Sequence, residues 1–256
     1  MRAIDLNCDM GESYGAWRMG RDGELMDHVS SVNIACGFHA GDPTTIRSTV
    51  EIALAKGKAV GAHPSYPDLQ GFGRREMALS QSEIFDAVLY QVAAVRGICE
   101  SLGGRLSHVK PHGALYNRAA RDRDAADAIA EAVRSIDDSL VLFGLAGSEL
   151  IEAAAAAGLT AASEVFADRT YSPDGSLTPR SQPRAVITDT NDAAAQVAAM
   201  LQSGTVTAID GSSLPITADT VCIHGDGPNA LEFARAISSR LTAAGYHIRP
   251  VSQRSE

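Results

Sequence analysis

Six side chains of the kinds that perform hydrolytic chemistry lie at, or within two residues of, the ends of short apolar segments in this sequence. They are Asp9, His39, His63, His112, Asp168 and His224. Two or three imidazoles with a carboxylate can hold a divalent cation that activates water. The same groups can act without a metal, as general acid and general base, with Lys110 and nearby arginines stabilising an oxyanion.

The histidines have no HxxH or HExxH spacing, so the sequence leaves the presence of a divalent metal open. If a metal is bound, its candidate ligands are Asp9, His39 and His63. Neither a GxGxxG motif after the first strand nor a GxxxxGK[ST] motif is present, so neither dinucleotide chemistry nor P-loop chemistry is indicated.

Seven apolar segments are predicted to be strands, and helix-like segments separate them. The predicted strands cover residues 3–9, 31–37, 59–65, 106–112, 140–146, 161–168 and 219–225. Two helices have recognisable starts, because Asp42 precedes Pro43 and because Ser80 and Glu83 have the spacing of a capping box.

Strands that alternate with helices favour a parallel sheet, since each crossover between parallel neighbours is supplied by a helix. Seven such units without a linker or a composition shift predict an α/β fold, a seven-stranded TIM-like (β/α) barrel forming one domain over 1–256. A doubly wound open sheet is the alternative. In a barrel, the carboxyl ends of the strands and their following loops form the active site. The irregular stretches 10–30 and 66–79 and the loop after Asp168 are expected on that rim.

Alternation of side chains along the strands predicts which residues face the barrel interior. Helices cover the outer face, so the polar rows should point inward. These rows contain Asp5, Asn7 and Asp9; His108, Lys110 and His112; Glu164 and Asp168; and His224 and Asp226. A lone buried charge costs several kcal/mol, so Lys110 is expected beside Asp9 or Glu164. Cys8 and Cys222 are expected to point away from the interior, which gives nucleophilic cysteine catalysis little support.

Composition excludes several classes of partner. The chain has 22 Lys and Arg against 31 Asp and Glu, a net charge of −9, which argues against binding to nucleic acid or to an anionic membrane. Acidic residues stand where a signal peptide would need its apolar region, and the four cysteines lie far apart. A cytoplasmic location is expected.

Several long motifs resemble the LamB/YcsF family. They are DLNCDMGESYGAW (5–17), NIACGFHAGDP (33–43), GAHPSYPDLQGFGRRE (61–76), VKPHGALYN (109–117), EVFADRTYSPDGSLTPR (164–180) and CIHGDGP (222–228). Family members are the A subunits of bacterial ATP-dependent 5-oxoprolinases. The family is similar in fold to the seven-stranded barrels of polysaccharide deacetylases, which agrees with the seven units predicted here.

The resemblance implies hydrolysis of the lactam of 5-oxo-L-proline to L-glutamate, coupled to hydrolysis of ATP to ADP and phosphate, together with the B and C partner subunits of the 5-oxoprolinase. ATP would be bound non-classically by this chain or mainly by a partner. Candidate catalytic residues are Asp9, Glu12, His63, Lys110, His112, Asp168 and His224. Candidate substrate- or phosphate-binding residues are Asn7, His39, Arg74, Arg75, Glu164, Arg169 and Asp226.

Two other functions stay open. The chain could be a stand-alone metal-dependent deacetylase or amidohydrolase that acts on an N-acyl or carbohydrate substrate. It could also be a non-catalytic scaffold subunit.

Overall fold

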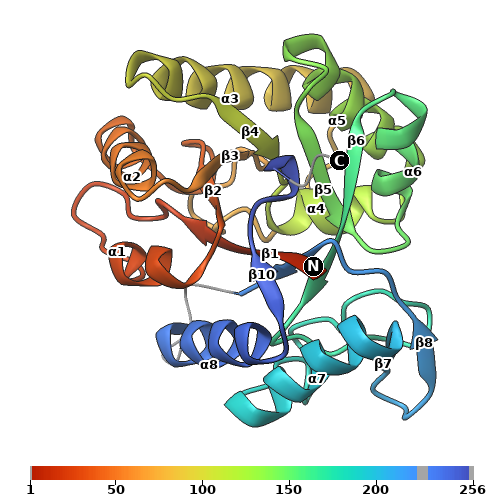
Figure 1. The fold of residues 1–256 in the computed structure, drawn as a ribbon. Coiled ribbons are helices and arrows are strands. Elements are labelled where there is room, and N and C mark those ends of the chain that lie inside the picture. Colours follow the sequence, from red (N-terminus) through yellow and green to blue (C-terminus); the bar gives the residue numbers. More distant parts are fainter. Residues whose placement is uncertain (1, 224–229, 254–256) are drawn as a thin grey trace.

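Strands and helices alternate along the computed structural model, which describes residues 2–223 and 230–253. Seven parallel strands close into a barrel (Figure 1). They are β1 (Arg2–Met10), β2 (Ser31–Ala35), β3 (Ala59–His63), β4 (Leu106–Val109), β5 (Val141–Leu145), β6 (Thr160–Phe166) and β9 (Thr220–Cys222). The ring closes because β9 pairs with both β6 and β1. The predicted fold is confirmed.

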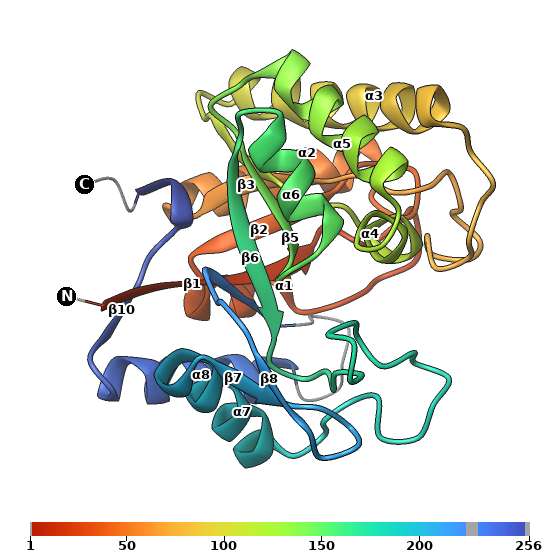
Figure 2. The same ribbon diagram turned by 90° about the vertical axis from the view of Figure 1, so that its right-hand side faces the viewer.

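Helices surround this barrel and, in the case of α4, lie at its rim (Figure 2). They are α1 (Asp22–Leu25), α2 (Pro43–Ala55), α3 (Gln81–Ser101), α4 (Gly113–Ala119), α5 (Arg123–Ile136), α6 (Glu149–Ala156), α7 (Thr190–Ser203) and α8 (Ala230–Ala243), with two 3-10 turns at Met26–His28 and Val251–Gln253. Both predicted helix starts are present. The Asp42 carboxylate accepts hydrogen bonds from the N–H groups of Thr44 and Thr45, and Ser80 and Glu83 form a capping box.

Three short strands were not predicted. The strands β7 (Thr205–Thr207) and β8 (Ser213–Pro215) form a separate antiparallel pair, and β10 (Tyr246–Ile248) pairs in parallel with the first residues of β1. Three residues are too few to show an alternating pattern. The fourth barrel strand is shorter than predicted, because Pro111 follows it and His112 occupies the N-cap position of α4.

The barrel interior is polar, as strand alternation predicted. Asp5 and Asn7 are fully buried, and the Asp5 carboxylate accepts hydrogen bonds from the hydroxyls of Ser30, Ser31 and Thr220. These hydrogen bonds compensate the free-energy cost of removing the Asp5 carboxylate from water.

The expected orientation of Cys222 is wrong. Its Sγ accepts a hydrogen bond of 3.1 Å from the Lys110 ammonium inside the barrel. Cys222 has the same parity as His224, so alternation along the strand places it inward rather than outward.

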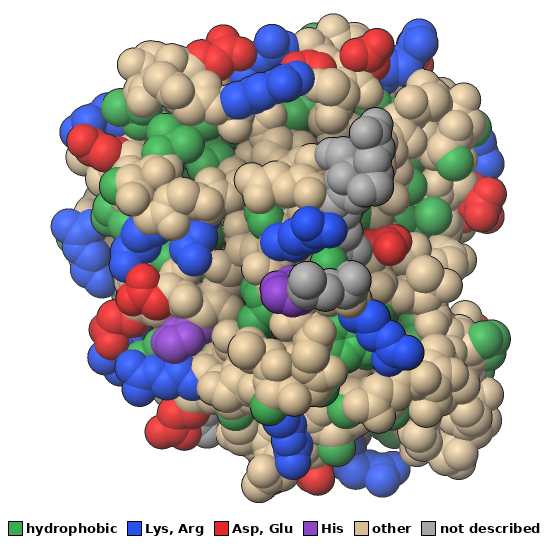
Figure 3. Space-filling model, in the orientation of Figure 1, with side chains coloured by type: hydrophobic (Ala, Val, Ile, Leu, Met, Phe, Trp, Pro, Cys, Tyr) green, Lys and Arg blue, Asp and Glu red, His purple; other side chains and the backbone are tan. Residues whose placement is uncertain are grey.

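Acidic and basic side chains are interspersed over the face of the molecule seen in Figure 3. Within residues 2–223 and 230–253, no helix combines the length and apolar character needed to cross a membrane.

Candidate active site

A cavity of about 630 Å³ opens at the rim formed by the carboxyl ends of the barrel strands. Asp9, His63, Lys110 and His112 line one end of it. Cavities of this size usually hold small-molecule ligands. The predicted rim site is therefore a real concavity, and residues from distant parts of the sequence meet there.

Lys110 lies between two carboxylates. Its Nζ is 2.9 Å from Asp9 Oδ1 and 2.9 Å from Glu164 Oε1. Burial alone would lower the pKa of Lys110, but Asp9, Cys222 and Glu164 together raise that pKa well above its usual value. Lys110 therefore carries a positive charge at the base of the cavity, beside the counter-charges predicted for it.

Three imidazoles surround the Asp9 carboxylate and its neighbour Glu12. Nε2 of His63 is 3.3 Å from Asp9 Oδ2, and Nδ1 of His112 is 2.9 Å from the same His63 nitrogen. His39 stacks on His112 with a ring separation of 3.8 Å, and its Nε2 is 3.3 Å from Glu12 Oε1. The predicted convergence of imidazoles and acids is present.

Burial lowers the pKa values of His39 and His112 well below their usual range, and the charge of neighbouring histidines lowers them further. Both rings are therefore neutral near pH 7, which is the form that binds metals. One ligand atom from each of Glu12, His39, His63 and His112 lies within 4.8 Å of the others. This donor set fits a divalent cation. It shares His39 and His63 with the predicted set, and Asp9 lies beside it.

A glycine brings the loop 66–79 over His112. Gly73 has a φ of +64°, and a Cβ there would lie 2.2 Å from Ser65 Oγ and 2.9 Å from the His112 ring. The N–H of Ala114 donates to the carbonyl oxygen of Gly73 at 2.9 Å. A side chain at residue 73 would push the loop 66–79 away from the rim. The position of this loop over His112 therefore depends on glycine at residue 73.

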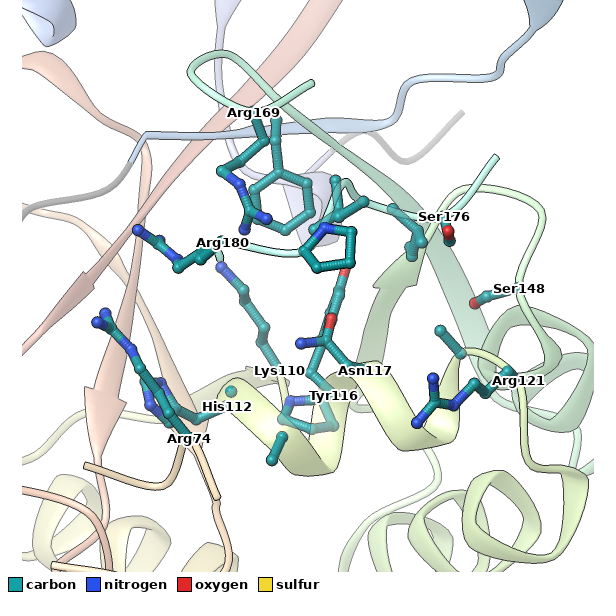
Figure 4. A pocket seen from close by; sticks show the side chains of 18 of the residues that line it. Arg74, Lys110, His112, Tyr116, Asn117, Arg121, Ser148, Arg169, Ser176 and Arg180 are labelled. Carbon is teal, nitrogen blue, oxygen red and sulfur yellow. The ribbon is translucent and has the colours of Figure 1, made fainter. Parts of the chain in front are cut away.

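Arginine side chains line the cavity beside Lys110 (Figure 4). The Arg74 guanidinium lies 5.0 Å from the centre of the Phe72 ring, and Arg180 lies nearby. Arg169 donates to the carbonyl oxygens of Thr178 and Ala185. Burial, followed by the charge of Arg180, lowers the pKa of Arg169 to about 10, so it stays charged at neutral pH. These cations suit an anionic ligand.

Not all predicted site residues meet at the cavity. Arg75 turns away and pairs with the buried Asp68. Asp168 is not among the cavity-lining residues of the described chain, and its carbonyl oxygen accepts from the N–H of Ile187. Asn7 and Glu164 lie deeper, hydrogen-bonded to each other inside the barrel. His224 and Asp226 fall outside the described residues.

Sequence reasoning did not single out several polar lining residues, among them Tyr116, Asn117, Arg121 and Ser148. Tyr116 and Asn117 fall inside the VKPHGALYN motif, so their closeness to Lys110 in sequence was a usable signal. Burial and the neighbouring Glu164 raise the pKa of Tyr116 well above its usual value, so its hydroxyl remains a hydrogen-bond donor.

Known proteins resemble this chain over most of its length. The family model of the LamB/YcsF family matches residues 4–256. A relative from Bordetella pertussis (strain Tohama I), named as the A subunit of 5-oxoprolinase, is 61% identical over 96% of this chain and 98% of its own length. A crystal structure of a lactam utilization protein from Thermus thermophilus is 50% identical, covers 96% of this chain and 99% of its own, and gives a TM-score of 0.91.

A peptidoglycan N-acetylglucosamine deacetylase from Eubacterium rectale shares the barrel fold, with a TM-score of 0.52 at 13% identity; the alignment covers 100% of this chain and 90% of that one. This likeness extends to the fold alone. The family model, in contrast, matches nearly the whole sequence, and the relatives from Bordetella pertussis and Thermus thermophilus are at least 50% identical to it. The chain belongs to the LamB/YcsF family.

Proposed function

We propose that this chain is the A subunit of an ATP-dependent 5-oxoprolinase, which works with the B and C subunits of that enzyme. The observation that carries the proposal is the meeting of Lys110, Asp9 and the imidazole of His63 at one end of a cavity lined by arginines. The names of similar proteins support the substrate, because they describe the A subunit of 5-oxoprolinase and a lactam utilization protein.

The chemistry of the substrate supports coupling to ATP. A five-membered lactam is an unstrained amide, and its nitrogen is a poor leaving group. The opened chain also closes again easily, so hydrolysis without activation is unfavourable. Transfer of the γ-phosphoryl group to the lactam oxygen releases ADP and leaves an O-phosphorylated imidate. Water then adds to the activated carbon, the carbon–nitrogen bond breaks as the nitrogen takes a proton, and an acyl phosphate results. A second water releases phosphate and gives L-glutamate.

The side chains at the cavity match these needs. Asp9 is paired with Lys110 and lies beside His63, and in this proposal it accepts a proton from the attacking water. The Lys110 ammonium stabilises negative charge that develops on oxygen. Tyr116 lines the same cavity, and its hydroxyl would donate a hydrogen bond to the departing nitrogen. Arg74 and Arg169 suit the substrate carboxylate or a phosphate.

A divalent cation fits the group formed by Glu12, His39, His63 and His112. When bound, such an ion lowers the pKa of a water molecule and polarises an oxygen atom. The neutral state of the His39 and His112 rings keeps this donor set available at neutral pH.

The test is an assay of the chain with the purified B and C subunits, in which release of L-glutamate and ADP is measured. His63→Ala and Lys110→Ala should each lower the rate by about 100-fold or more. Lys56→Ala, which removes a surface ammonium paired with Asp27, is the matched control and should change little. A folded, assembled complex that releases no glutamate would refute the proposal.

The imidazole–carboxylate group also favours a second candidate, a metal-dependent deacetylase or amidohydrolase. Metal-dependent hydrolysis of an N-acetyl substrate by the chain alone, without ATP, would support that function instead. If His63→Ala and Lys110→Ala both left the activity of the complex intact, a scaffold role would be supported.

A further inference from the structure

The cavity has a second end that the proposed chemistry does not use. Figure 4 shows Arg121, Ser148 and Ser176 across the cavity from Lys110, Arg74 and Arg180. A molecule with one five-membered ring and one carboxylate fills only part of a cavity of about 630 Å³. The remaining space is bounded by the turn between β5 and the helix α6.

Ser148 holds the N-cap position of α6 without acting as a cap. Its side chain makes no capping hydrogen bond, and its buried Oγ has no hydrogen-bond partner, although the residue is only 5% exposed. In contrast, Asp42 and Ser80 both use their side-chain oxygens to cap their helices. A buried hydroxyl without a partner costs free energy, so a ligand that bonds to it would recover that cost.

The backbone around Ser148 is also open toward a ligand. Gly147 has a φ of +75°, and a Cβ built on it would meet no atom within 4 Å. The N–H of Glu149 donates to the carbonyl oxygen of Ala120 at 3.1 Å, which holds the segment carrying Arg121 against the start of α6. The N–H of Ser148 is likewise bonded, to the carbonyl oxygen of Leu145 at 3.0 Å. What this turn offers a ligand at the positive end of the helix dipole is therefore the Ser148 hydroxyl, beside the open backbone of Gly147.

We propose that the start of α6 is a phosphate-binding subsite, formed by the Ser148 hydroxyl, the backbone of Gly147 and the Arg121 guanidinium. A phosphate group accepts hydrogen bonds at every oxygen, so it can accept from the unpartnered Ser148 hydroxyl and from the Arg121 guanidinium at the same time. The phosphate would belong either to the polyphosphate of ATP or to the phosphorylated substrate, and this identification rests on the proposed function. The subsite itself does not depend on that source.

Nearby carboxylates limit what this subsite can bind. Arg121 pairs with Glu76 at the surface, and Asp174 also lines the cavity. An uncharged polar ligand would leave the Arg121–Glu76 pair undisturbed, whereas a phosphate competes with Glu76 for the guanidinium. Phosphate binding should therefore weaken the ion pair, and the Glu76→Gln variant should bind phosphate more tightly than the native chain.

The test is a titration of the full chain with inorganic phosphate, ATP and ADP, followed by the amide NMR signals of Gly147 and Leu150 and by calorimetry. Phosphate or ATP should shift these amides. Ser148→Ala and Arg121→Gln should each weaken binding about tenfold. The matched control is Arg123→Gln, because Arg123 is an exposed, carboxylate-paired arginine near α6 that does not line the cavity. The affinity of Arg123→Gln for phosphate and ATP should equal that of the native chain.

The result that overturns the subsite is binding of phosphate and ATP with the same affinity in the native chain, Ser148→Ala and Arg121→Gln, or no binding of either. ATP that displaces phosphate from these amides identifies the nucleotide as the source, whereas phosphate binding without ATP binding identifies a phosphorylated substrate. Loss of folding in Ser148→Ala leaves Arg121→Gln as the deciding variant.

This inference and the proposed function fail in different ways. If the complex released no glutamate but phosphate still shifted Gly147 and Leu150, the subsite would stand and the proposed function would fall. If the complex were active and ATP were the source of the phosphate, Ser148→Ala should raise the KM for ATP about tenfold and leave the KM for 5-oxoproline near its native value. An unchanged KM for ATP together with unchanged phosphate binding would refute the subsite alone.

Discussion

His63 and His112 each point one ring nitrogen at the other, with His63 Nε2 lying 2.9 Å from His112 Nδ1. The second nitrogen of each ring faces a carbonyl oxygen, that of Lys110 at 2.7 Å from His63 Nδ1 and that of Phe72 at 2.9 Å from His112 Nε2. A carbonyl oxygen only accepts hydrogen bonds, so these second nitrogens both carry hydrogen. When both rings are neutral, two lone pairs therefore face the same space, and a shared proton or a metal cation there relieves their repulsion.

The first prediction concerns that cation. The chain should bind one equivalent of a divalent transition metal such as Zn²⁺, and His63→Ala and His112→Ala should each weaken the affinity by more than about tenfold. Equilibrium dialysis with elemental analysis measures both. His247→Ala, which removes an exposed histidine, serves as the control. Metal binding that persists in both site variants would show that the facing nitrogens share a proton instead.

The second prediction concerns the buried ion pairs of Lys110. Glu164→Gln removes one of its two carboxylate partners inside the barrel and leaves the ammonium less well compensated. The free energy of unfolding in urea should fall by about 3 kcal/mol. Glu131→Gln, at an exposed position of α5, should change it by less than about 0.5 kcal/mol. Equal stability of the two variants would mean that Asp9 alone satisfies Lys110.

The third prediction is a loss of stability in acid caused by His108. This ring donates to Asn33 inside the barrel, and burial, assisted by the charges of Lys110 and His63 and opposed by Asp9, lowers its pKa to about 3. The unfolded chain protonates this histidine below about pH 6.5. Between these values the unfolded state binds more protons, so stability falls as the pH falls, by up to about 1.4 kcal/mol per pH unit.

Urea unfolding at pH 7.5 and pH 5 measures this effect. The difference in free energy of unfolding between the two pH values should be smaller in His108→Gln than in the native chain, because glutamine keeps a hydrogen-bond donor for Asn33 and does not titrate. The same pH difference in both proteins would show that other groups control the acid response.

Sequence periodicity predicted the polar barrel interior because strand alternation is a local property of the backbone. The inward placement of Asp5, Asn7 and Asp9 follows from their spacing of two residues, and the pairing of Lys110 follows from the cost of a lone buried charge. The stacking of His39 on His112 could not be predicted. It depends on how two separate loops cross the rim, and that path is set by tertiary contacts at glycines such as Gly73.

The fourth prediction compares two glycines. A Cβ on Gly61 would lie 2.1 Å from His108 Nε2, so Gly61→Ala should force the buried ring from its place and lower the free energy of unfolding by about 2 kcal/mol. Gly97 lies in α3, and a Cβ there would meet no atom within 4 Å. Gly97→Ala should therefore stabilise the chain by about 0.5 kcal/mol or more. Thermal and urea unfolding distinguish the two, and a similar change in both would contradict the packing described around His108.

The fifth prediction separates Arg74 from Arg75, which the sequence presents as an equal pair. Arg74 lines the cavity over the Phe72 ring, whereas Arg75 binds the buried carboxylate of Asp68. Arg74→Gln should raise the KM for 5-oxoproline or ATP in the complex and leave the melting temperature unchanged, because it removes a cation that faces the ligand. Arg75→Gln should lower the melting temperature, because Asp68 stays buried without its cation. Assays of both variants in the same complex check this difference, and a larger KM effect from Arg75→Gln than from Arg74→Gln would reverse the assignment.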